Sequence, residues 1–434
     1  MVKCYTLNGE FYEQGLCFHD FNHICEVLKN NEEILQHFPV ESILLLINEY
    51  SKIISKDRDI LKEEGVPFLC FYLKKANLEK IIELNLKNKS YLDGFIEVGD
   101  KKFIKAQKRG LACHWIAGNV GTLGIYSILQ SIICRNSNLV RIPENCIDLI
   151  IRLLKPFKDI KIDYKEESYS GKDILKNICI VNFPSSNLQL NSHMSKLADC
   201  RVFWGGEEAL NSIRSLPQKT TCKDIIFGPK YSFAIFDKEA IESIQLEKYL
   251  ENLVTDIVSF NQKACSSPHV VFLEKSSISL EEVTQRFIKV FKKLYKRYPV
   301  KFLGETTCAD IINIRGEYAL SVDKMLHCSK GFEYTILIGS EFKLEEPIGG
   351  RTVFLKEIDD IFEVKQLITP RVQTVGIALK NQERAINLAN EITKAGVDRV
   401  VKVGYMSLYD SPWDGSLVIS DMVRWCSLNI NGMI

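Results

Sequence analysis

The feature that most constrains the fold of this chain is an alternation of short apolar runs and helix-length segments that begins at Leu111. The runs LACHWIA, NLVRI, NICIVNF and CRVFW have the length of strands, and segments such as TLGIYSILQSIICR separate them. A second series follows Asp224, through YSFAIFD, VVFLE and RTVFL. Strands joined by helices build a mostly parallel sheet covered by helices. The sequence therefore predicts an α/β fold, with a domain boundary near residue 235.

The first hundred residues show helical periodicity instead. The segment PVESILLLINEYSKIISKDRDILK begins at Pro39, a residue that is common at helix starts. We expect a packing helix here, because apolar side chains recur along one face of it. These side chains are Ile43, Leu46, Ile47, Tyr50, Ile53 and Ile54.

Composition excludes several classes of function. The 56 Lys and Arg residues nearly balance the 55 Asp and Glu residues, so the net charge of +1 provides no field that attracts nucleic acid. The basic stretch KVFKKLYKR carries apolar residues at helical spacing and is interpreted as a solvated helix face. No run approaches the ~18 apolar residues that a membrane span needs. We therefore expect neither a nucleic-acid partner nor a membrane span.

The cysteines point to a reducing compartment. The chain contains 14 of them, but they are scattered, and none has the spacing of a zinc site. The N-terminal sequence MVKCYTLNGEFYEQG lacks the apolar run of a signal peptide. We expect a cytoplasmic protein with reduced thiols and no metal ion.

Cys265 differs from the other cysteines in its setting. It lies in the polar loop NQKACSSPH, between a long helical segment and the apolar run VVFLE. Loops on rigid scaffolds often carry catalytic residues. Lys263 and His269 are nearby cations that would favour the thiolate, the reactive form. A nucleophile is one interpretation of Cys265, and a half-buried loop thiol is the other.

Two glycine-bearing loops follow apolar runs. The loop GNVGTLG starts at Gly118, and the pair Gly205-Gly206 follows CRVFW. Main-chain amides at a helix start can face a phosphate, and the side chain of Asn119 can donate to a developing oxyanion. A structural strand-to-helix turn explains the same pattern, since the spacing is not GxGxxG. His114, inside the preceding apolar run, is interpreted as a core residue.

Taken together, these segments resemble the aldehyde dehydrogenase superfamily and, within it, the acyl-CoA reductases typified by the fatty-acid reductase of bacterial luminescence. The resemblance runs from about Leu111 to Arg424. NQKACSSPHVVFLE is similar to the nucleophile segment, with Cys265 in the catalytic place. AGNVGTLG is similar to the loop of the oxyanion-donating asparagine, which falls on Asn119. The implied fold is aldehyde dehydrogenase-like, with a Rossmann-type cofactor domain and an α/β catalytic domain.

The resemblance also implies a nicotinamide cofactor. NSNLVRIPE is similar to a strand whose end meets the adenosine ribose, and FWGGEEA to the turn that follows another cofactor-binding strand. The family implies NADPH, and Arg141 suits a 2′-phosphate. Glu144 favours a free 2′-hydroxyl instead, so NADH remains the alternative. The implied cofactor-binding residues are Gly118, Arg141, Glu144, Trp204, Gly205 and Gly206.

One departure from the superfamily pattern bears on the reaction. Aldehyde-oxidising members carry a glutamate in an ELGGK-like strand, where it activates water. The similar stretch here is IFGPK, and the position falls on Ile226, which cannot act as a base. An acyl group on Cys265 would then resist water and await hydride or a thiol. This departure favours acyl reduction over oxidation of an aldehyde to the free acid.

The resemblance therefore predicts NADPH-dependent reduction of a fatty acyl-CoA or acyl-protein thioester to the aldehyde through an acyl-cysteine. The alternatives are a CoA-acylating dehydrogenase of a small aldehyde and a non-catalytic scaffold. An acyl-protein synthetase is a candidate partner, and a homo-oligomer is expected by analogy. Residues 1–235, joined by part of 405–434, would hold the N-terminal helices and the cofactor domain. Residues 236–404 would form the catalytic domain.

Overall fold

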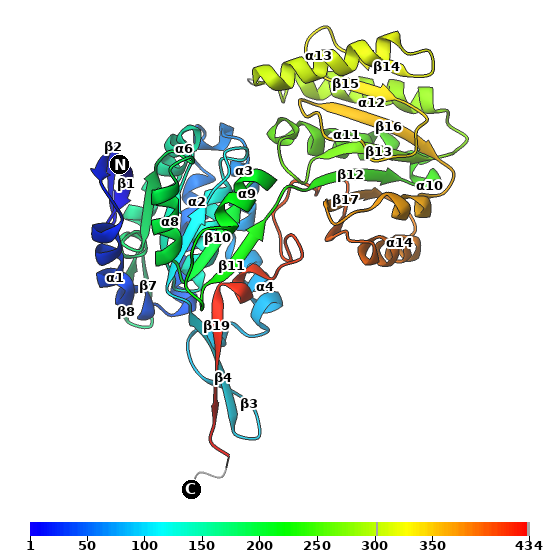
Figure 1. Ribbon diagram of the computed structural model, residues 1–434. Coiled ribbons are helices and arrows are strands. Elements are labelled where there is room, and N and C mark those ends of the chain that lie inside the picture. Colours follow the sequence, from blue (N-terminus) through cyan, green and yellow to red (C-terminus); the bar gives the residue numbers. More distant parts are fainter. Residues whose placement is uncertain (301–302, 432–434) are drawn as a thin grey trace. The chain divides into compact units, whose positions relative to one another are not determined.

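The structure is a computed structural model that describes residues 1–300 and 303–431. The chain divides into two compact units (Figure 1). Unit 1 consists of Met1–Gly228 and Tyr409–Ile434, and unit 2 of Pro229–Leu408. Unit 2 is therefore an insertion in the sequence of unit 1.

The centre of unit 1 is a seven-stranded sheet. Five neighbouring strands run parallel, and the remaining two pair antiparallel at one edge. The alternation predicted from Leu111 onward is confirmed in this sheet, because a helix lies between most of its parallel strands in sequence. In sheet order the strands are β11 (Lys223–Phe227), β10 (Cys200–Trp204), β5 (Leu111–Trp115), β6 (Ser137–Arg141), β9 (Ile178–Asn182), β1 (Val2–Leu7) and β2 (Glu10–Phe18).

The order of the parallel strands creates a switch point at β5. From β5 the chain proceeds to β6 and β9 on one side, and then returns to place β10 and β11 on the other side. The direction of winding thus reverses between β5 and β10. In open α/β sheets, ligands bind at the carboxyl ends of the strands at such a point.

Helices and two smaller sheets complete unit 1. Figure 1 shows a three-stranded sheet extending from the body of this unit. It consists of β3 (Ile96–Gly99), β4 (Lys102–Lys108) and β19 (Val423–Asn429), and a hairpin is formed by β7 (Lys161–Tyr164) and β8 (Glu167–Ser170). The helices are α1 (Asn22–Gln36), α2 (Val40–Ile54), α3 (Val66–Tyr72), α4 (Lys75–Leu86), α5 (Leu123–Ile133), α6 (Glu144–Leu154), α7 (Gly171–Leu175), α8 (Leu188–Leu197), α9 (Glu207–Arg214) and α15 (Val418–Asp421), with 3₁₀ turns η1 (Ile60–Lys62), η2 (Lys89–Leu92) and η3 (Lys155–Asp159).

Helix α2 confirms the helix predicted after Pro39, which occupies the N-cap position. Five of the six predicted inward residues are buried, but Ile53 is 44% exposed. Its predicted place is wrong because Ile53 and Ile54 lie about 100° apart around a helix. Of these two side chains, only Ile54 is buried in the core.

Unit 2 contains a second seven-stranded sheet, parallel except for one edge strand. Central strands of parallel sheets are buried on both faces; every residue of β12 and β13 is buried accordingly. Apolar residues of α11 and α12 pack on one face, and residues of α13 and α14 on the other. In sheet order the strands are β14 (Met325–Cys328), β15 (Thr335–Ile338), β16 (Thr352–Ile358), β13 (Pro268–Glu274), β12 (Tyr231–Phe236), β17 (Val372–Ala378) and β18 (Arg399–Lys402). The helices are α10 (Lys238–Ile241), α11 (Leu246–Val258), α12 (Leu280–Tyr295), α13 (Glu305–Leu320) and α14 (Gln382–Lys394), with turns η4 (Ser259–Gln262) and η5 (Ile361–Leu367).

The helices of the described residues were also compared with the dimensions of a bilayer. None of these helices combines the length and the apolar character needed to cross one.

Candidate active site

Two glycine loops of unit 1 lie at the carboxyl ends of β5 and β10, on either side of the switch point. Gly118 and Asn119 follow β5 and are exposed. A Cβ atom at Gly118 would lie 3.0 Å from Oδ1 of Asn145, whose amide donates to the Gly118 carbonyl at 3.1 Å. Gly205 and Gly206 follow β10, and Gly206 is the N-cap residue of α9. The structure therefore brings these four predicted residues to one edge of one sheet.

Arg141 and Glu144 lie at the same edge. Arg141 is the last residue of β6, and Glu144 is the first residue of α6. The Arg141 side chain is half-buried, and its Nη2 donates to the Phe183 carbonyl at 3.3 Å. Its Nε is buried and has no hydrogen-bond partner among the described residues. Burial lowers the pKa of Arg141 by disfavouring its charged form. The unpartnered Nε can donate to an anion at this position.

Trp204 lies at the end of β10, but its side chain faces the interior of unit 1. Its ring stacks on Phe227 with a centroid distance of 3.8 Å, and Nε1 donates to Ser127 Oγ at 3.5 Å. The indole is therefore a packing group, and only the main chain of Trp204 lies beside the glycine turn. Ile226, the neighbour of Phe227 in β11, packs against the same unit's apolar core.

His114 is a core residue, as predicted. It is fully buried in β5, where Nδ1 lies 2.8 Å from Ser127 Oγ and Nε2 lies 3.0 Å from Asn138 Oδ1. Burial lowers the pKa of His114 to about 4. The imidazole is therefore neutral near pH 7 and satisfied within the sheet.

In unit 2, the segment before Cys265 has an unusual backbone. Helix α11 ends at Val258, and Phe260, Asn261 and Gln262 then adopt φ values of 56°, 47° and 64°. The left-handed region costs non-glycine residues on the order of 1–3 kcal/mol each, unless surrounding contacts fix it. The turn reverses the chain between α11 and β13 and places Cys265 between them.

Buried side-chain contacts hold this turn in place. Asn261 Oδ1 accepts from Arg351 Nη2 at 3.1 Å. The Gln262 amide donates to the carbonyls of Pro268 and Thr352 at 2.8 and 2.9 Å, and its Oε1 accepts from the Thr352 amide at 2.9 Å. The side-chain amide of Gln262 thus pairs with the main chain of Thr352 in β16 as the main chain of a neighbouring strand would. These bonds fix the main chain three residues before Cys265.

Cys265 itself is held at two points. Gln373, a buried residue of β17, donates from Nε2 to the Cys265 Sγ at 3.1 Å. Ser232 of β12 donates from Oγ to the Cys265 carbonyl at 2.7 Å, and the amide of Thr374 donates to the same Oγ at 3.1 Å. A donor aimed at sulfur stabilises a thiolate more than a thiol. The arrangement therefore suits a nucleophilic cysteine.

His269 does not provide the positive charge expected near Cys265. It is buried in β13, and burial lowers its pKa to about 3. Its Nδ1 has no hydrogen-bond partner among the described residues. The expectation of a histidine cation here is wrong, because the strand that follows the loop is inside the core. Lys263, in contrast, is exposed.

Sequence reasoning missed Gln373 and Ser232. Gln373 lies in VQTVGIA and Ser232 in YSFAIF, two strands that are otherwise mostly apolar and that prove to be buried. A polar side chain inside such a strand needs a partner, and this was the available signal. Among the described residues, no group of three or more His, Cys, Asp or Glu side chains is arranged to hold a metal ion.

Solved structures show the same fold. An NADP-dependent glyceraldehyde-3-phosphate dehydrogenase from Bacillus halodurans, complexed with NADP, superimposes with a TM-score of 0.64 at 14% identity over 98% of this chain and 99% of that chain. A variant of aldehyde dehydrogenase C from Pseudomonas syringae, complexed with NAD⁺ and octanal, gives 0.67 at 10% identity over 100% of this chain and 94% of that chain. The predicted aldehyde dehydrogenase-like fold is confirmed.

Sequence comparison identifies the family. The long-chain acyl-protein thioester reductase of Aliivibrio fischeri is 24% identical over 344 residues, which are 77% of this chain and 66% of that relative. This chain thus spans just under two thirds of the Aliivibrio protein. A reductase of the same name from Photorhabdus laumondii is 23% identical over 88% of this chain and 76% of its own length. The profile of the acyl-CoA reductase (LuxC) family matches residues 35–425. The resemblance seen in the sequence is therefore confirmed, and the chain belongs to the acyl-CoA reductase (LuxC) family.

Proposed function

We propose that this protein reduces an acyl thioester to an aldehyde, with Cys265 as the nucleophile that carries the acyl group. The observation that carries the proposal is the hydrogen bond of 3.1 Å from buried Gln373 to the Cys265 Sγ. A buried donor aimed at sulfur, at the end of a braced turn, goes beyond what a structural thiol requires. Membership of the family supports the reaction class.

In the proposed reaction, the thiolate of Cys265 attacks the carbonyl carbon of the donor thioester. The main-chain amide of Cys265 donates to the developing oxyanion, and such donors contribute ~3 kcal/mol in comparable sites. The family resemblance gives Asn119 the role of the second oxyanion donor. The donor's thiolate leaves, takes up a proton, and the acyl group stays on Cys265. Ile226, in the place of a glutamate base, gives the acyl-enzyme no water-activating carboxylate.

The carboxyl edge of the unit 1 sheet fits a dinucleotide. Gly118, Gly205 and Gly206 leave the main chain accessible beside the switch point, and the unpartnered Arg141 Nε can bind an anionic or hydroxyl group. When bound, a nicotinamide cofactor supplies the hydride that converts the acyl group on Cys265 to the aldehyde. We assign unit 1 to cofactor binding and unit 2 to the nucleophile.

We propose NADPH as the preferred cofactor. Arg141 ends β6, the strand that follows β5 in the chain, and its planar guanidinium suits a 2′-phosphate. The Bacillus halodurans dehydrogenase, which has the same fold, was solved in complex with NADP. Glu144 at the start of α6 opposes this preference, since a carboxylate repels a 2′-phosphate. NADH therefore remains the comparison cofactor in every assay.

The proposed donor is a long-chain acyl group carried by a protein or by coenzyme A. Two relatives are named long-chain acyl-protein thioester reductases. An acyl-protein synthetase is accordingly the proposed partner. We place the protein in the reducing cytoplasm, because all 14 of its cysteines are free thiols.

A homo-oligomer is also proposed, and the three-stranded sheet of unit 1 is its proposed contact. This sheet exposes Val98, Trp425 and Leu428, each at least 40% accessible. Trp425 and Leu428 are three residues apart in β19 and lie on opposite faces of this sheet. Exposed apolar side chains on a projecting sheet are typical of a protein interface. β19, which carries two of them, pairs with β4 and leaves its other edge without a partner strand among the described residues.

Oxidation of NADPH or NADH by the purified protein with acyl-CoAs of graded chain length tests the function. Cys265→Ala is expected to abolish turnover, whereas Cys308→Ala, which removes another partly accessible thiol of unit 2, keeps it. Intact mass spectrometry follows the acyl group on Cys265 directly. Turnover that survives Cys265→Ala would disprove the covalent route, and absence of both turnover and acylation with every donor would disprove the proposed function.

A further inference from the structure

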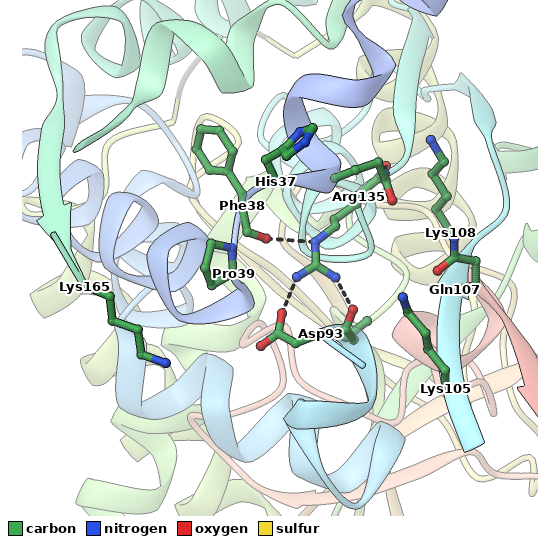
Figure 2. Close-up of a pocket in the computed structure, with 11 residues that line it drawn as sticks. His37, Phe38, Pro39, Asp93, Lys105, Gln107, Lys108, Arg135 and Lys165 are labelled. Atoms are coloured by element: carbon green, nitrogen blue, oxygen red, sulfur yellow. Dashed lines mark hydrogen bonds and ion pairs between the residues drawn. The ribbon is translucent and has the colours of Figure 1, made fainter. Parts of the chain in front are cut away.

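Unit 1 contains a second candidate binding site, at the edge of its sheet opposite to the glycine loops (Figure 2). It is a pocket of about 300 Å³. Lys108, which ends β4 shortly before β5 begins, and Arg135, which lies just before β6, both line it. The pocket therefore lies at the amino ends of these strands. The proposed cofactor residues lie at their carboxyl ends, so the two sites are distinct.

The lining is strongly basic in a chain with balanced charge. The whole sequence has a net charge of +1, yet the pocket is lined by four Lys and Arg residues and a single carboxylate, Asp93. The four cations come from three separate places in the chain: strand β4, the turn before β6, and the turn between β7 and β8. They are Lys105, Lys108, Arg135 and Lys165.

Two of these cations are neutralised within the protein. Arg135 is 7% exposed, and its guanidinium donates to Asp93 and to the carbonyls of Phe38 and Leu92. Asp93 also accepts from the amide of Val40, at the start of α2, at 2.9 Å. Asp93 is thus engaged with Arg135 and the helix terminus, and Lys108 forms an ion pair with Glu32 outside the pocket. The Arg135 side chain is therefore a buried part of the pocket lining, and its position is fixed by these hydrogen bonds.

The remaining two cations lack such a partner. Among the residues that the structure describes, no carboxylate forms an ion pair with Lys105 or Lys165. The Lys165 ammonium lies 5.4 Å from the centre of the Tyr164 ring, which leaves its hydrogen-bond donors available. In Figure 2 the two lysines lie on opposite sides of the Arg135–Asp93 pair. They leave two positive charges around one small cavity.

We propose that this pocket binds a small anion through a phosphate group, as in a phosphomonoester or a diphosphate. Ammonium groups are compact cations with rotatable donors that suit phosphate oxygens. The apolar side chains of Phe38, Pro39 and Leu92 also line the pocket and can cover the body of the ligand. A volume of about 300 Å³ is at the lower end of small-molecule pockets, so a whole dinucleotide does not fit. The proposal stands independently of the acyl reductase function.

Calorimetric titration of the full-length protein with inorganic pyrophosphate, at constant ionic strength, tests this site. We expect saturable binding that the double variant Lys105→Ala/Lys165→Ala weakens by at least about tenfold, as expected for the loss of two charged contacts. Lys102→Ala/Lys161→Ala is the matched control. It removes two exposed lysines at the starts of β4 and β7, outside the pocket, and changes the net charge equally. The control is expected to bind within about twofold of the parent, because salt largely screens the field of exposed charges that lie outside the pocket.

A second titration identifies the source of the phosphate. Glycerol 3-phosphate represents a free metabolite. Coenzyme A, compared with 3′-dephospho-coenzyme A, represents a larger molecule that would bind through its 3′-phosphate. Whichever compound binds more tightly than inorganic phosphate, and is weakened by Lys105→Ala/Lys165→Ala, identifies the class. Absence of saturable binding would overturn the proposal. Equal weakening in both double variants, or weakening in Arg141→Ala instead, would also overturn it.

Discussion

At the scale of single residues, two hydrogen-bond donors fix the position of Cys265 in the candidate site. Gln373 donates to the Cys265 sulfur and Ser232 to the Cys265 carbonyl, so both ends of the cysteine are positioned from neighbouring strands. His269, only four residues further along the chain, is neutral and buried. Stabilisation of a thiolate at Cys265 thus comes from a neutral amide and not from an imidazolium.

Gln373→Leu is expected to raise the pKa of the Cys265 thiol by about 1–2 units. A hydrogen bond to a charged group contributes ~1.5–3 kcal/mol, and one pKa unit corresponds to about 1.4 kcal/mol. The rate of alkylation of Cys265 by iodoacetamide, followed against pH by mass spectrometry, measures the shift. Gln285→Leu, on the exposed side of α12, serves as the control.

An unchanged alkylation profile in Gln373→Leu would show that this amide only packs against sulfur. Gln373→Glu extends the test, because a carboxylate beside sulfur should raise the thiol pKa further. A merely structural role for Gln373 would affect both variants through folding and leave the shape of the pH profile unchanged.

The sequence points to Cys265 and Asn119 as candidates through their loops, but it could not supply Gln373. That contact joins residues 108 positions apart, and only the pairing of β17 with β12 brings them together. The side-chain direction of Trp204 also depends on tertiary packing against Phe227. Residues at the ends of strands are thus predictable as positions, whereas their contacts are not.

At the scale of elements, α11 contacts two other segments of unit 2, the turn before Cys265 and the segment around Gly404. Its end leads into the left-handed turn before Cys265. Near that end, Asp256 is buried and accepts hydrogen bonds from the amides of Gly404 and Met406. Sequence periodicity predicts the helix, but not three consecutive left-handed residues. Their conformation depends on bonds from Arg351 and Thr352, about 90 residues away.

Asp256 should make the stability of unit 2 depend on pH. Burial raises its pKa to about 7, although the bonds from Gly404 and Met406 oppose this shift. An unfolded aspartate titrates near ~3.9, so between about pH 4 and 7 the folded state binds more protons. Stability should therefore fall as pH rises through this window and level off above it.

Calorimetry of the full-length protein at pH 5 and pH 7 measures this effect. Asp256→Asn is expected to lose most of the decrease, whereas Asp359→Asn, at an exposed position, should behave as the parent does. The same pH dependence in both variants would assign it to another group.

At the scale of the whole molecule, the projecting sheet of unit 1 is the proposed contact between copies. Trp425→Glu combined with Leu428→Glu places a charge on each face of β19 and should convert an oligomer to monomers, because buried charge opposes association. Sedimentation velocity measures the change, with an expected increase of at least about 100-fold in the dissociation constant. Leu320→Glu with Val322→Glu, two highly exposed positions of unit 2, is the control. A parent protein that sediments as a monomer at all concentrations would contradict the proposed interface.

The return of the chain to unit 1 after Leu408 has a consequence for biosynthesis. A ribosome that translates this sequence synthesises all of unit 2 before it makes β19, which pairs with β4 along seven residues. Unit 1 thus lacks its last strand during the whole synthesis of unit 2. Until β19 has left the ribosome and paired, the nascent chain exposes the edge of β4, and chaperone binding during synthesis should be strongest there.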